Sequence, residues 1–417
     1  MSRKARRGAG LLLYPLLLLT CFSSPQRAWG FATWRGEAAS LEIRGFGRLA
    51  GGYLHFYGDP AVQERDDDSW SGAFRVLADG TVGGRVDFSA NLLEEASSVM
   101  VTPLGKPALD VERSALLTRR QRSTDEYLAQ LSLDHLVCTW RSSRLDVSIG
   151  RQPVNLATTF FFTPNDFFAP FAAQTFFRTY KAGVDAARAE IRFGDLTQLT
   201  LLGVLSYDQD PSSDTGWSRA PDWRRTSLLA RMVTSSLGFE WGMLAGTVHD
   251  RTVVGGSLQG ELWDWLGLRA EGHYGSQEEG EGRDAAEFCL GLEHRFPGSL
   301  DLQAEYFYHG QGYSSMDQAN QALLAGATPD GYLGKNYSAL SASYEFSPLL
   351  TGQALLLVNW TDCSRLWSLY GVYSLSDESE LTTTISIPDG DSPERGVPTS
   401  EFGAAPMTVS LEYRLYF

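Results

Sequence analysis

The chain has 417 residues, of which 43% are hydrophobic and 12% aromatic, and its formal charge is -15. This acidity argues against nucleic acid as a partner, because binding a phosphate backbone needs a basic surface. Beyond residue 30 no stretch reaches the roughly 20 apolar residues of a spanning helix, which excludes a helical membrane protein, and no linker-like composition divides the chain into soluble domains.

The first predicted element is an export signal at residues 1–30. A basic segment precedes the apolar run Leu11–Leu19, and Ala28-Trp29-Gly30 has the small-x-small pattern of a cleavage site. We therefore expect residues 1–30 to be removed and residues 31–417 to form one domain. Cys21 would allow a lipoprotein signal, but a threonine is unfavourable directly before a lipidated cysteine.

Apolar and polar residues alternate with a period of two through the rest of the chain, which indicates β-strands. In the final segment, for example, a polar residue separates each of Met407, Val409, Leu411, Tyr413, Leu415 and Phe417. A charge at every second position would cost about 2 to 4 kcal/mol facing lipid near the bilayer midplane, so the polar face must line water. The pattern predicts an all-β fold, a transmembrane antiparallel up-and-down β-barrel.

Short and long connections alternate along this barrel. Short turns are expected near Gly83-Gly84, Ser142-Ser143, Gly194-Asp195, Leu237-Gly238, Asp264, Pro297-Gly298, Pro348 and Ser376-Asp377. Longer polar loops are expected at roughly 58–70, 95–124, 152–181, 207–223, 275–284, 310–334 and 388–404. The spacing predicts about 18 strands with both termini on the periplasmic side. Sixteen strands remain an alternative, because segments 239–262 and 361–364 contain only weak turn signals.

The end of the chain predicts the location of the protein. Tyr413, Leu415 and Phe417 place hydrophobic residues at alternate positions, with an aromatic residue last. This pattern resembles the insertion signal of outer-membrane barrels. We therefore expect the protein in the outer membrane of a Gram-negative bacterium, inserted by the barrel-assembly machinery and surrounded by outer-membrane lipid and lipopolysaccharide.

Alternation also assigns charged residues to the lumen. The predicted pore-lining residues carry both signs and are Arg44, Arg48, Arg85, Asp87, Asp146, Arg188, Glu190, Arg192, Arg269, Glu271, Asp301, Glu305, Glu412 and Arg414. For any one of them, a structural ion pair in the lumen is the alternative role. Together they predict a hydrophilic channel with a transverse electric field, suited to polar solutes.

The loop at 152–181 has an unusual composition of nine aromatic residues and three prolines. So many aromatic side chains do not remain in open solvent, so the loop must pack either inside the lumen as a constriction or against the barrel rim. We expect the pore constriction to be formed by Arg151, Asp166, Arg178, Lys181 and Asp185. Asp166 and Asp185 could instead pin the loop by pairing with Arg151 or Arg178, which is the role that we favour.

The residues around this loop resemble a known family. They are Gly150-Arg151-Gln152, Asn155, Thr163-Pro164-Asn165-Asp166-Phe167-Phe168-Ala169-Pro170-Phe171 and Gly183-Val184-Asp185-Ala186. Over about 40 residues they look like the strand-loop-strand signature of outer-membrane porins related to the alginate-export barrels. The resemblance implies a monomeric barrel whose substrate pathway is narrowed by loops and lined by charged side chains. It supports the fold and the transport class rather than alginate as the substrate.

The function that these observations predict is passive passage of small hydrophilic or anionic solutes. An enzyme is not expected, because the six histidines show no metal-ligand spacing and no Gly-x-Ser-x-Gly motif occurs. No cofactor or metal is expected either, and the three cysteines beyond residue 30 give no disulfide framework. Two alternatives remain: an export conduit for a polysaccharide, and a structural barrel that acts as a sheath for a partner such as a cytochrome.

Overall fold

The computed structural model describes residues 32–57, 66–98, 112–123, 127–210, 217–276, 284–325 and 331–417. The expected signal peptide at residues 1–30 lies outside the described residues. In the described part of the chain, no helix is long and apolar enough to cross a membrane.

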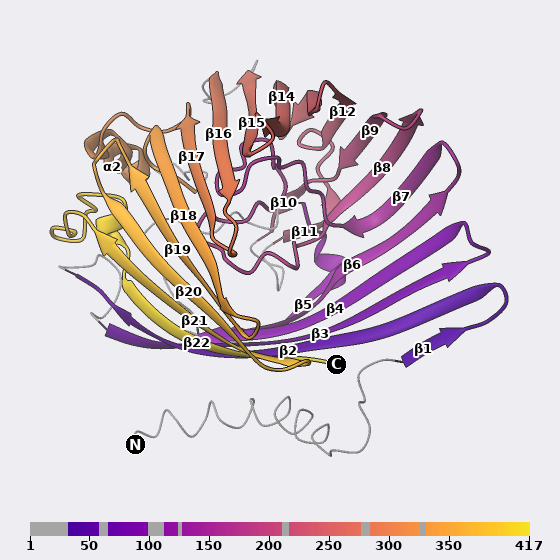
Figure 1. Cartoon of the computed structure of the whole chain (residues 1–417), viewed down its shortest axis with the longest axis horizontal. Helices are drawn as coiled ribbons and strands as arrows, with labels where there is room; N and C mark the ends of the chain where they lie inside the picture. Colours follow the sequence, from indigo (N-terminus) through magenta and orange to yellow (C-terminus); the bar gives the residue numbers. More distant parts are fainter. Residues whose placement is uncertain are drawn as a thin grey trace.

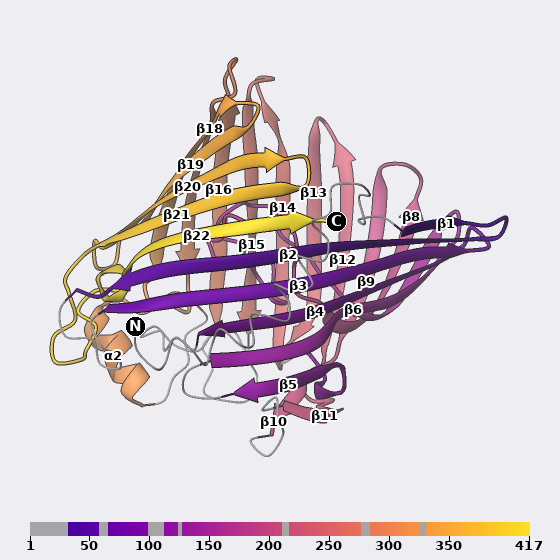
Figure 2. The same ribbon diagram turned by 90° about the horizontal axis from the view of Figure 1, so that it is seen from below.

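The described strands curve into a ring that closes on itself, as Figures 1 and 2 show. Eighteen of them, each antiparallel to its neighbours, form the barrel wall, in agreement with the predicted strand number. In order around the wall they are β2 (Ala39–His55), β3 (Asp66–Val82), β4 (Val86–Ser98), β6 (Tyr127–Arg141), β7 (Leu145–Gln152), β8 (Val184–Phe193), β9 (Thr197–Val204), β12 (Ser227–Ser236), β13 (Phe239–Val248), β14 (Arg251–Leu262), β15 (Leu266–Ser276), β16 (Ala285–Arg295), β17 (Asp301–His309), β18 (Asn336–Ser347), β19 (Leu350–Asn359), β20 (Arg365–Ser376), β21 (Ser379–Asp389) and β22 (Met407–Tyr416).

The remaining elements sit at the ends of this wall. Strand β1 (Ala32–Arg35) pairs with the first residues of β2, and β5 (Thr118–Ser123) pairs with β6. A short hairpin of β10 (Tyr207–Gln209) and β11 (Trp217–Pro221) lies between β9 and β12. The long connections also contain η1 (Ala115–Leu117), α2 (Met316–Leu324) and η2 (Phe402–Ala404).

The eight predicted short turns each join two neighbouring strands of the wall. The two segments with weak turn signals, 239–262 and 361–364, also contain tight connections. His249 and Asp250 join β13 to β14 with positive φ angles of 46° and 69°, which suits the right-handed twist of a hairpin. Residues 360–364 join β19 to β20. These two connections are the reason that the wall has 18 strands rather than 16.

Some loop boundaries differ from the prediction because strands extend into polar sequence. The loop expected at 58–70 ends earlier, since β3 begins at Asp66 and pairs there with His55 of β2. The loop expected at 95–124 contains the end of β4 and all of β5. Hydrogen bonding along a ladder depends on the backbone, so a run of acidic residues can lie in a strand when its neighbour is in register.

The outer face of the wall is apolar. Large exposed hydrophobic side chains recur at alternate positions, as in Trp367, Leu369 and Tyr373 of β20. The aromatic ones also gather at the strand ends, where Trp263, Trp265 and Trp360 are exposed. This distribution matches the apolar band and aromatic girdles of a membrane-spanning barrel.

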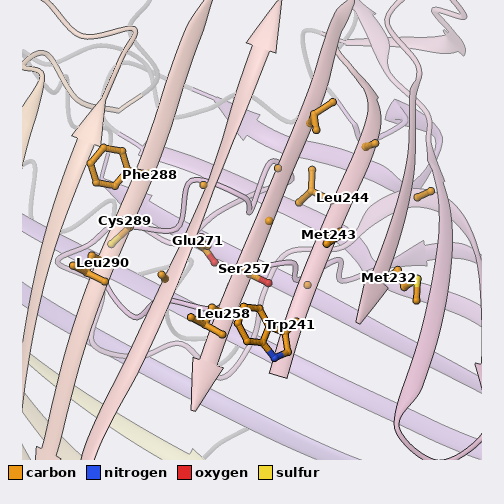
Figure 3. Close-up of a pocket in the computed structure, with 18 of the residues that line it drawn as sticks. Met232, Trp241, Met243, Leu244, Ser257, Leu258, Glu271, Phe288, Cys289 and Leu290 are labelled. Atoms are coloured by element: carbon orange, nitrogen blue, oxygen red, sulfur yellow. The ribbon is translucent and has the colours of Figure 1, made fainter. Parts of the chain in front are cut away.

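A hollow of about 990 Å³ lies in the same outer face over β12–β16. Figure 3 shows Met232, Trp241 and Phe288 around it. Its floor includes Gly256 and Gly272, where the backbone carries no side chain. Because Met232, Trp241 and Phe288 are exposed and apolar, the hollow opens on the outer surface and not into the lumen.

The first and last wall strands close the ring. Strand β22 pairs with β2 from Phe46 to His55, and the terminal Phe417 exchanges two backbone hydrogen bonds with Gly45. The ring of Phe417 stacks on Phe74 of β3, with ring centroids 5.6 Å apart. A side chain at position 45 would overlap the ring of Phe417, so the glycine makes room for the terminal aromatic residue.

Candidate functional site

The connection between β7 and β8, residues 153–183, runs inside the ring of strands (Figure 1). We call it the inserted loop. Its first apolar contact is with the wall at β8, β9 and β12–β14. Val154, Leu156 and Phe168 of the loop are buried there in one cluster with wall residues Val184, Ala186, Leu202, Val204, Leu229, Leu244, Val248 and Val253.

The second apolar contact is with the wall at β16–β20. Phe161, Phe162 and Ala173 of the loop are buried there with Cys289, Phe307, Tyr337, Ala339, Leu355, Leu357, Leu366 and Phe402. The rings of Phe162 and Phe307 stack with centroids 5.0 Å apart. The loop is therefore anchored on two parts of the wall, which explains where its aromatic side chains go.

Arg151 and Asp185 stand at the two ends of the loop, on β7 and β8. Their side chains form an ion pair of 2.7 Å between Nε and Oδ1, and the Arg151 side chain is fully buried. Arg151 also donates to the carbonyl oxygens of Leu133 and Ser114, and Asp185 accepts from the Ser114 backbone N–H at 2.7 Å. The pair thus holds the base of the inserted loop closed.

Asp166 and Lys181 lie within the loop and pair with each other. Lys181 Nζ lies 2.5 Å from both carboxylate oxygens of Asp166. Burial raises the pKa of Asp166 and lowers the pKa of Lys181, and the attraction between the two charges offsets part of each shift. This ion pair joins the middle of the loop to its end, so it fixes the shape of the loop.

Arg178 is bound by the loop itself. Its guanidinium donates to the carbonyl oxygens of Phe160, Ala172, Ala173 and Thr175. Burial lowers the pKa of this arginine, although Glu305 opposes the shift. Each of the five residues expected at the constriction is therefore engaged in holding the inserted loop.

Two of the expected pore-lining residues, Glu271 and Glu305, lie beneath the loop. Each is 3% exposed, and their carboxylates accept hydrogen bonds from loop backbone N–H groups. Arg269 lies beside them, with its guanidinium carbon 4.2 Å from the centroid of the Phe160 ring. All three residues are close to the loop rather than on open lumen surface.

The other edge of the loop faces β2, β3 and β22. Arg414 stacks on Phe177 with its guanidinium carbon 3.9 Å from the ring centroid, and Arg75 stacks on Tyr180 at 4.6 Å. Phe46 of β2 lies between them, 6.0 Å from the Phe177 ring and 5.6 Å from the Tyr180 ring. Such stacks combine an apolar contact with attraction between a cation and the face of a ring.

Many of the remaining expected pore-lining residues form ion pairs, four of them between neighbouring strands or their ends and one, Arg188–Glu190, within β8. These pairs are Arg44–Asp79, Arg48–Glu412, Arg141–Asp87, Arg188–Glu190 and Arg192–Asp146. Asp301 is the first residue of β17, and Arg85 lies in the turn between β3 and β4. The lumen surface thus carries both charge signs, arranged mostly as partners.

One further contributor to the site is not predicted by any sequence pattern. The segment 112–117, in the long connection between β4 and β6, also packs against the base of the inserted loop through Ser114. Asp134 of β6 binds Arg75 at 2.7 Å and Arg113 at 3.1 Å. Asp134 lies at an irregularity in the pairing of β4 with β6, which alternation along a regular strand does not predict.

No protein-family model matches the chain, and no curated protein sequence matches it. Among solved structures, it is similar to Acinetobacter baumannii OccAB4, with a TM-score of 0.55 and 9% identity over 90% of this chain and 98% of that one. Pseudomonas aeruginosa OccK2 (OpdF) gives a TM-score of 0.53 and 13% identity over 90% and 98% of the two chains. These neighbours are outer-membrane porins. The likeness shows that this chain has the fold of a porin, a closed antiparallel barrel of 18 strands.

Proposed function

We propose that the protein is an outer-membrane channel through which small hydrophilic or anionic solutes pass passively. The observation that carries the proposal is the inserted loop, held across the lumen of a closed barrel whose outer face is apolar. A barrel of this size has a water-filled interior unless something fills it. A loop fixed on two parts of the wall narrows that interior and leaves a path for small solutes.

The five residues expected at the constriction fit this function as positioning groups. Arg151 and Asp185 fix the base of the loop, whereas Asp166, Lys181 and Arg178 fix its shape. The solute path then runs along the edge of the loop that faces β2, β3 and β22. Arg44 and Arg48 of β2 are 46% and 35% exposed there, whereas Arg75 and Arg414 are buried.

The same proposal includes the orientation of the barrel in the outer membrane. The short turns and both termini lie on the periplasmic side, and the long connections face outward. Outer-membrane lipid and lipopolysaccharide surround the apolar face, and Tyr413, Leu415 and Phe417 present the insertion signal to the barrel-assembly machinery. The barrel works as a monomer without cofactor or enzymatic activity, and its relation to the alginate-export barrels stays a prediction.

Because a packed loop crosses the lumen, we favour passage of small solutes over a polysaccharide conduit or a sheath for a partner protein. A polysaccharide conduit needs a continuous wide path, and a sheath needs room for a folded partner. The apolar contacts of Phe162 and Phe168 would have to break before either could enter.

Planar bilayers containing the purified mature protein test this proposal. We expect discrete steps of ion conductance, and a reversal potential in a salt gradient that reports which ion sign the lumen prefers. A barrel that stays electrically silent, including after deletion of residues 156–177, would contradict a channel function.

A further inference from the structure

The tip of the inserted loop carries backbone groups that need partners. Residues 158–165 lie outside the strands of the described chain, so no ladder satisfies their N–H groups. A buried N–H without an acceptor costs about as much free energy as a lost hydrogen bond. The lumen wall must therefore supply acceptors at this level, or water must fill the space.

Two carboxylates supply those acceptors. Glu305 of β17 accepts from the consecutive N–H groups of Phe160, Phe161 and Phe162, at 2.5, 2.9 and 3.0 Å. Glu271 of β15 accepts from the N–H groups of Thr158, Thr159 and Asn165. An ionised carboxylate has room for about four such bonds, so the six donors are within the capacity of two glutamates.

The wall around the two glutamates is shaped to receive the loop. On β16, between them, Cys289 pairs with Glu271 and Gly291 pairs with Glu305. A Cβ at Gly291 would lie 3.2 Å from Glu305 Cγ, so the glycine gives the carboxylate space to turn toward the loop. The backbone oxygen of Gly256 on β14 accepts from Asn165 Nδ2 at 3.0 Å.

Because Glu271 and Glu305 are buried, their side chains do not line the water-filled lumen. Both side chains are almost completely covered, and a covered carboxylate is retained only when hydrogen bonds replace its hydration. The bonds found here go mainly to the backbone of one loop, rather than to a neighbouring cation on the wall. A hydrogen bond to a charged group contributes more to stability than one between neutral groups.

We propose that Glu271 and Glu305 are positioning residues that latch the loop tip to the wall and thereby set the width of the channel. The latch replaces the role of solute contact expected for them from the sequence. The effect of the latch on channel width rests on the proposed function, whereas the hydrogen bonds that form the latch do not depend on it. With both carboxylates removed, the tip is free to move and the channel admits larger solutes.

Hydrogen exchange of the whole mature protein in detergent micelles tests the latch without any transport assay. In Glu305→Gln we expect the amides of residues 160–162 to exchange about tenfold faster or more, because a charge-assisted bond is lost. In Glu271→Gln the amides of 158, 159 and 165 should show the change instead. Glu240→Gln is the matched control, since this lumen glutamate of β13 binds Gln259. Unchanged protection of both sets of amides would overturn the proposal.

The channel width is then measured by the size of polyethylene glycol that enters the pore and lowers its conductance. The double variant Glu271→Gln/Glu305→Gln should admit larger polymers than the native protein, whereas Glu240→Gln should not. If the native protein conducts and the double variant has the same size limit, the latch does not set the width. If the native protein conducts no ions, the proposed channel function is contradicted. The hydrogen-exchange result still tests whether the two glutamates hold the loop tip.

Discussion

The two edges of the inserted loop differ in how they meet the wall. At the edge that faces β14–β18, loop backbone groups bind Glu271 and Glu305 and aromatic rings are buried in an apolar cluster. At the edge that faces β2, β3 and β22, rings stack on the buried side chains of Arg75 and Arg414. Arg44 and Arg48 of β2 are partly exposed. The first edge, which we call the fixed edge, is held by backbone hydrogen bonds to buried carboxylates. The second edge packs through stacked rings but borders the partly exposed Arg44 and Arg48, and we call it the accessible edge. We therefore propose that the solute path follows the accessible edge.

The largest expected effect comes from breaking the ion pair inside the loop. Asp166→Asn leaves Lys181 buried without its partner, which should lower the free energy of unfolding by about 3 to 5 kcal/mol. Urea unfolding in lipid vesicles, followed by tryptophan fluorescence, measures the change. The double variant Asp166→Leu/Lys181→Met should recover most of the loss, because it removes both charges together. A single variant as stable as the native protein would show that the pair does not hold the loop.

The segment 331–337, which contacts the inserted loop through Tyr332 and is held by Glu401, should respond to pH. This buried carboxylate accepts from four donors: the N–H groups of Leu333 and Gly334, the Tyr337 hydroxyl and the Asn359 amide. Burial raises the pKa of Glu401 to about 7 from an ordinary value of 4.5. A raised pKa means that its contribution is fully present below about pH 4.5 and is lost as the pH rises through about 7, on the order of 3 kcal/mol.

Hydrogen exchange of residues 331–337 between pH 5 and pH 9 checks this sign, after correction for the intrinsic rate. Protection should fall as the pH rises through 7 in the native protein and stay level in Glu401→Gln. Glu394→Gln, in the same connection but exposed, should behave as the native protein does. Protection that rises with pH would contradict the assignment.

The wall beside the accessible edge can be tested at its seam. Gly45→Ala should force the Phe417 ring away from β2 and cost about 1 to 3 kcal/mol by overpacking. Gly51→Ala on the same strand is the control, because a Cβ there meets nothing within 4 Å. The temperature at which the folded band is lost in gel electrophoresis should drop for the first variant only. Equal temperatures would show that the seam does not depend on this contact.

The smallest expected effect concerns ion preference at the accessible edge. Arg48→Gln removes one partly exposed positive charge from the lumen and leaves Glu412, so the reversal potential should shift by a few millivolts toward cations. Arg365→Gln removes a charge from an exposed position at the first residue of β20 and should leave the potential unchanged. An equal shift in both variants would mean that the path does not pass Arg48.

Local chemistry was enough to predict the eight short turns and most of the wall strands. Glycine, proline, asparagine and aspartate favour tight turns, and alternation marks a wall with water on one side. Gly83-Gly84 and Pro297-Gly298, for example, were found as turns because each interrupts a clear run of alternating residues. The pairing of β13 with β14 was harder to predict, because His249 and Asp250 adopt positive φ angles without a glycine.

The loop site could be predicted only in part. Its aromatic composition required packing, but the choice between lumen and rim depends on partners more than 100 residues away, such as Glu271 for Thr159. At the ends of the loop, Asp185 was expected to pair with Arg151 or Arg178, and it binds Arg151. Asp166 binds Lys181 rather than either arginine. That choice depends on how the loop folds back on itself, which spacing alone does not specify.

The central claim is that the inserted loop narrows an open aqueous lumen. Single-channel conductance of the mature protein, compared with that of a variant lacking residues 156–177, tests it most directly. The deletion should raise the conductance about threefold, because an 18-strand barrel without the loop is wide, and circular dichroism should remain that of a β-barrel. Equal conductance in the two folded proteins would contradict the account.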